Sequence, residues 1–71
     1  MKMIGLITNT LLVDKLKLEA ELEEVLNNKT IPYKERLDMC ISTLRELNEV
    51  INTINLWESF QQINNQKQKE D

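Results

Sequence analysis

The feature that most constrains this fold is a run of apolar residues spaced alternately four and three positions apart. Residues at this spacing share one face of a helix, and the pattern is typical of a helix that packs against another helix. It predicts an all-α fold and excludes a sheet over this part of the chain. The stripe consists of Tyr33, Leu37, Cys40, Leu44, Leu47, Ile51 and Ile54.

A second helical pattern precedes this stripe, and a turn signal separates the two. Between residues 9 and 26, apolar residues recur on one broad face of the predicted first helix: Leu11, Leu12, Leu16, Leu18, Leu22, Val25 and Leu26. The segment 27–31 contains two asparagines, which suit a helix end, and Pro32 suits the first turn of the next helix. We therefore expect one domain over residues 1–65, with a helix at 9–26, a turn at 27–31 and a long helix at 32–64. Residues 66–71 are predicted to be a polar, flexible tail.

A connection of five residues makes the two helices antiparallel neighbours. Folding the chain about this turn pairs residues whose numbers sum to about 59, so that Leu22 meets Leu37. The charges agree with this register, because it also places Glu23 opposite Arg36 and Asp14 opposite Arg45. Exposed ion pairs contribute only about 0–1 kcal/mol each, so they select the register more than they stabilise it.

The small size of the chain predicts self-association. A core built from 71 residues rarely leaves more than roughly 3–5 kcal/mol of net stability. The single cysteine, Cys40, rules out an internal disulfide, and one cysteine without any histidine cannot form a structural zinc site. We therefore expect the hairpin to assemble into a four-helix bundle or a higher helical oligomer, with a dimer favoured.

A second group of large apolar residues lies outside the stripe. On a helical wheel Val50, Trp57 and Phe60 point away from the first helix. Monomers seldom expose such a patch, so we expect it to close a homo-oligomer, to be covered by residues 3–7, or to anchor a foreign protein. The predicted partner or oligomer interface comprises Met39, Val50, Leu56, Trp57, Phe60 and Ile63.

A polar strip beside the stripe is the candidate site for a small ligand. Asn48, Asn52 and Asn55 lie opposite Thr8 in the predicted register. Their amide and hydroxyl groups could hydrogen-bond a polar molecule in a cleft between helices. The alternative interpretation is a solvated helix face in an asparagine-rich protein.

The sequence predicts no catalytic residue, no cofactor and no metal ligand. It lacks histidine, the usual general acid or base, and Glu19 and Glu23 fit a solvated acidic face better than a metal site. The net charge of −3 argues against nucleic acid. The apolar start of the chain is interrupted at Thr8 and falls short of the roughly 20 residues that span a bilayer. We therefore expect a cytoplasmic protein, in the producing or the host cell, without a membrane partner.

These observations favour a small non-enzymatic protein-binding module with a regulatory, inhibitory or assembly role. Ile, Asn and Lys supply 22 of the 71 residues, and their AT-rich codons suggest a phage, a plasmid or an AT-rich bacterium. The first alternative is an oligomeric small-molecule binder that uses the Asn and Thr strip. The second is a structural coiled-coil spacer.

Overall fold

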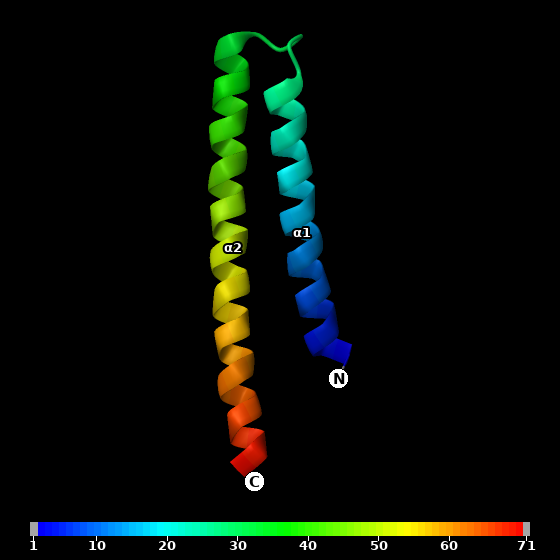
Figure 1. The fold of residues 1–71 in the computed structure, drawn as a ribbon, viewed down its shortest axis with the longest axis vertical. Coiled ribbons are helices and arrows are strands. Elements are labelled where there is room, and N and C mark those ends of the chain that lie inside the picture. Colours follow the sequence, from blue (N-terminus) through cyan, green and yellow to red (C-terminus); the bar gives the residue numbers. More distant parts are fainter. Residues whose placement is uncertain (1, 71) are drawn as a thin grey trace.

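The protein is a hairpin of two helices that lie side by side and run in opposite directions (Figure 1). The computed structural model describes residues 2–70, with side chains for residues 2–64. Helix α1 spans Lys2–Asn27 and helix α2 spans Tyr33–Glu70. The molecule measures 59 × 18 × 13 Å, so it is a rod two helices wide. The predicted all-α antiparallel hairpin is confirmed.

Both helices are longer than the sequence pattern indicates. Helix α1 begins at Lys2 and not near residue 9, because Ile4 and Ile7 are half-buried and extend its packed face. Gly5 lowers helix stability by about 1 kcal/mol, a cost that this packing offsets. Helix α2 ends at Glu70, whereas the prediction ended it near residue 64. Residues 66–70 of the predicted tail are helical, and Asp71 lies outside the described residues. Gln, Lys and Glu are good helix formers, and no Gly or Pro interrupts them.

Asn28 organises the turn between the helices. Its side-chain oxygen accepts hydrogen bonds from the backbone N–H of Thr30, at 3.1 Å, and from the Thr30 hydroxyl. Its carbonyl oxygen accepts from the backbone N–H of Ile31 at 3.3 Å and from Nη1 of Arg36 at 3.4 Å. An asparagine that bonds the backbone two residues ahead imitates a backbone turn, which is the reason for its preference at such sites.

The two helices meet along an interhelical seam of mostly half-buried side chains that follows the heptad spacing on both sides. Among the side chains described, only Cys40 is classed as buried, with 8% of its surface exposed. The seam consists of Ile4, Thr8, Leu11, Lys15, Leu18, Leu22 and Val25 on α1, and of Arg36, Cys40, Thr43, Leu47, Val50, Ile54, Trp57 and Gln61 on α2.

The observed register corrects the predicted one. Nε1 of Trp57 donates a hydrogen bond to Oγ1 of Thr8 at 3.0 Å, so opposing residues have numbers that add to 65, not 59. The prediction failed because the turn rises beyond the end of α1 before α2 begins (Figure 1). The predicted pair of Glu23 with Arg36 is therefore wrong, and Arg36 reaches the turn at Asn28. Arg45 lies opposite residue 20 in this register and not opposite Asp14.

Candidate protein-interaction surface

The apolar stripe that the sequence predicts does not point straight at α1. Cys40, Leu47 and Ile54 lie in the interhelical seam, but the stripe's other members remain largely exposed. Thr43, Val50 and Trp57 fill the seam in their place. Compared with the predicted packing, α2 is thus rotated about its own axis. Half of its stripe lies on the seam, and the other half lies on one side of the hairpin. The exposed fractions are 73% for Tyr33, 47% for Leu37, 50% for Leu44 and 36% for Ile51.

Helix α1 contributes apolar residues to the same side. Leu26 of α1 lines one hollow together with Tyr33 and Leu37 of α2, and Leu12 lines another with Ile54 and Trp57. The first hollow shows that exposed apolar residues of the two helices adjoin one another, and the second places Leu12 beside the seam. We call this side the apolar flank, and it holds eight of the fifteen large hydrophobic residues exposed in the described chain: Leu12, Leu16, Leu26, Tyr33, Leu37, Ile41, Leu44 and Ile51.

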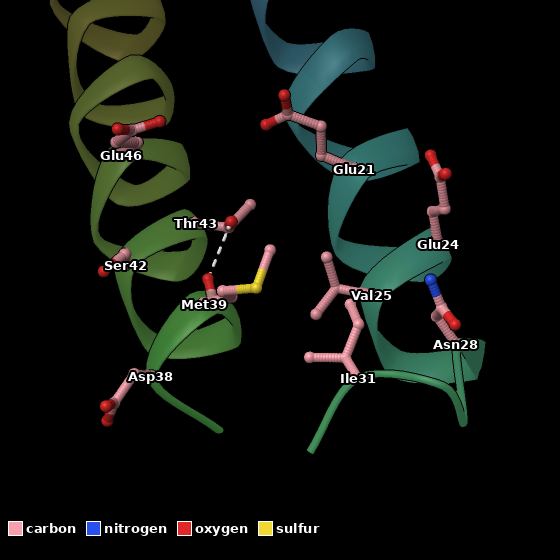
Figure 2. Close-up of a pocket in the computed structure, with 10 residues that line it drawn as sticks. All are labelled: Glu21, Glu24, Val25, Asn28, Ile31, Asp38, Met39, Ser42, Thr43 and Glu46. Carbon is pink, nitrogen blue, oxygen red and sulfur yellow. Dashed lines mark hydrogen bonds between the residues drawn. The ribbon is translucent and has the colours of Figure 1, made fainter. Parts of the chain in front are cut away.

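The opposite side of the hairpin is negatively charged between the turn and the level of Asp14. It contains two open hollows between the helices, and in Figure 2 Glu21 and Glu46 extend toward each other across the gap, above Met39 and Val25. Like charges at such an edge repel one another and also repel anions. We call this side the acidic flank, and its carboxylates belong to Asp14, Glu21, Glu24, Asp38, Glu46 and Glu49.

Of the six residues predicted to form an interface, two lie in the seam and four are exposed on α2. Val50 and Trp57 lie in the seam against α1, contrary to the prediction that they point away from it. Met39 lines the acidic flank and is 44% exposed. Phe60 is 57% exposed and stacks on Trp57 with ring centres 6.0 Å apart. The two remaining members are exposed on α2: Leu56 by 71% and Ile63 by 56%.

The residues of the predicted ligand strip are also separated. Thr8 lies in the seam, where its hydroxyl accepts the indole N–H of Trp57. Asn48, Asn52 and Asn55 are exposed on α2, and the hollow that Thr8 lines is formed by other residues. The rotation of α2 accounts for this difference, because it turns the asparagines away from the seam.

Among the side chains of residues 2–64, no three from His, Cys, Asp or Glu are grouped so that they could hold a metal ion. Neither helix, over its described length, combines the hydropathy and the length needed to cross a bilayer.

Sequence reasoning missed the apolar flank, although a signal for it was present. The predicted stripe on the first helix was too broad for one partner helix, because Leu12, Leu16 and Leu26 widen it to one side. A stripe of this width indicates contact with two neighbours.

Comparison with protein-family models, with curated proteins and with solved structures finds no significant match for this chain.

Proposed function

We propose that this protein is a small, non-enzymatic protein-binding module that works by packing helices against a partner. It acts as a homo-oligomer, with a dimer favoured, in a regulatory, inhibitory or assembly role. A reducing compartment such as the cytoplasm suits its single thiol, Cys40. The proposal uses the two features that the hairpin offers, which are its apolar flank and its acidic flank.

The observation that carries this proposal is how little surface the hairpin buries by itself. The chain exposes 6122 Å², which is about half of the roughly 12,000 Å² that an unfolded chain of 8.4 kDa exposes. A domain of about 60 residues usually buries about 60% of that surface. With Cys40 as the one buried side chain among those described, and that one still 8% exposed, the isolated hairpin lacks a core and needs a partner to complete one.

The chemistry of the two flanks defines the class of partner. The apolar flank suits another helical surface, because amphipathic helices recognise one another through rows of residues at this spacing. The acidic flank and the net charge of −3 favour proteins over nucleic acids. No comparable observation supports the small-molecule binder, since the Asn and Thr strip is not assembled in one place.

Thermal unfolding followed by circular dichroism at increasing protein concentration tests the proposal. If the chain completes its core with itself, the melting temperature rises with concentration, because association stabilises the folded form by mass action. If it needs a foreign protein, helicity stays low at every concentration. A monomer with a high, concentration-independent melting temperature would contradict the proposal, because such a hairpin needs no partner.

A further inference from the structure

We propose that the apolar flank is the face through which two copies of this chain pair, with their turns at the same end, into a four-helix bundle. This inference rests on the proposed function and names its partner as a second copy. It replaces the interface predicted from sequence, because Val50 and Trp57 of that interface are occupied within the hairpin.

The two apolar stripes face in a direction that fits a bundle of four helices. In an isolated pair of helices, each stripe would point straight at the other helix. Here Leu37 and Leu44 of α2 and Leu12 of α1 are all displaced to the same side of the seam. In a four-helix bundle each helix has two neighbours, so its stripe points between them, toward the centre of the bundle. The observed rotation of both helices is the one that a bundle requires.

The hairpin leaves more of its surface exposed to solvent than folded proteins of its mass usually do. Folded proteins of 8.4 kDa expose about 4,600 Å², so this chain exposes roughly 1,500 Å² more than is usual for its mass. A stable interface of standard size covers about 800 Å² on each partner, and obligate dimers cover more. The excess therefore matches an obligate dimer, and the apolar flank is the largest group of exposed apolar residues available to supply it.

The charges beside the apolar flank decide how the two copies are oriented. Glu19 lies seven residues from both Leu12 and Leu26, so it shares the flank's face of α1, and Glu23 follows one turn later. Arg45 lies at the same level on α2 in the observed register. With both turns at one end, α1 of each copy packs beside α2 of the other, and these acids approach the partner copy's arginine. With the turns at opposite ends, α1 packs beside α1, and these acids lie away from the partner copy's arginine. The attraction gained in the first case favours it.

The solution mass measured by light scattering tests the pairing face. Leu44 on the apolar flank and Met39 on the acidic flank are similarly exposed, at 50% and 44%. Leu44→Glu and Met39→Glu therefore introduce the same charge at equally exposed apolar positions on opposite sides of the hairpin. We expect the mass of two chains for the wild type and for Met39→Glu, and the mass of one chain for Leu44→Glu.

Two results would overturn the inference. A wild-type mass of one chain would exclude self-pairing, and helicity then separates the remaining cases. Low helicity would leave a foreign partner and the protein-binding part of the proposed function standing, whereas a stable, helical monomer would reject both. A dimer that Met39→Glu or Leu56→Glu dissociates while Leu44→Glu does not would move the interface away from the apolar flank.

A distance between spin labels tests the orientation in the dimer without disturbing the interface. A label on Lys29→Cys, in a Cys40→Ala background, reports the separation of the two turns. We expect a separation comparable with the width of a bundle. A distance between the two labels close to the length of a helix would overturn the proposed orientation, because it would place the turns at opposite ends.

Discussion

At the scale of single residues, the contact between Trp57 and Thr8 fixes the register of the hairpin. The indole N–H is half-buried between the helices, where a tryptophan donor normally requires an acceptor. The Thr8 hydroxyl is that acceptor, at 3.0 Å. It lies in the second turn of α1, so this one hydrogen bond joins the open end of the hairpin across 49 residues of sequence.

Replacing this acceptor should weaken the hairpin. We expect Thr8→Val, which preserves the shape of the side chain, to lower the free energy of unfolding by about 1 kcal/mol, because the indole donor loses its partner. Urea titration measures the difference. Thr8→Ser retains the hydroxyl and should lie closer to the wild type. Equal losses for the two variants would show that packing, and not the hydrogen bond, is responsible.

At the scale of elements, Asn28 determines how α1 is joined to α2. Four groups of the following segment donate to its oxygens: the backbone N–H and the hydroxyl of Thr30, the backbone N–H of Ile31 and the guanidinium of Arg36. The level at which α2 starts relative to α1 follows from this turn. The register of the whole seam therefore depends on a residue that lies outside both helices.

Asn28→Ala should destabilise the hairpin by about 1 kcal/mol, because it removes the side-chain acceptor that shapes the turn. Lys29→Ala is the matched control, because Lys29 is exposed in the same turn. Melting temperatures of the two variants, compared at one protein concentration, measure the effect. If Lys29→Ala lowers the melting temperature as much as Asn28→Ala, the turn is not organised by the asparagine.

At the scale of the whole molecule, the hairpin has two unlike sides. Apolar residues gather on one flank, and carboxylates from both helices gather on the other. The acidic flank works against folding of the isolated hairpin, because Glu21 and Glu46 face each other across the interhelical gap (Figure 2). A protein that retains such repulsion has an outward face that resists further self-association.

Reversing one charge on the acidic flank should therefore stabilise the hairpin. We expect Glu46→Lys to raise the stability by about 0.5 kcal/mol at low ionic strength, with the gain shrinking as salt screens the charges. Glu58→Lys is the control, because Glu58 lines a hollow in which it is the only acid. Thermal melts at low and high salt check both variants. A gain that does not change with salt would contradict an electrostatic origin.

Some residues of the candidate interaction surface can be predicted from the sequence, but their positions relative to α1 cannot. The exposed half of the stripe, with Leu37, Leu44 and Ile51, was identified as apolar, but it was assigned to the contact with α1. Val50 and Trp57 were recognised as large apolar residues beside that stripe, but they were placed on an outer face. Both errors have one cause, which is a rotation of α2 by about half the 100° step between successive residues.

Helical periodicity and turn preferences are local properties, so they are enough to predict two antiparallel helices joined by a turn at residues 27–31. They also predict more apolar residues than a two-helix core can hold. The rotation of α2 and the register through Trp57 and Thr8 follow only from the folded structure, and with them the set of apolar residues that remain exposed. A broad stripe packs nearly as well at neighbouring rotations, so the choice depends on contacts between residues far apart in sequence.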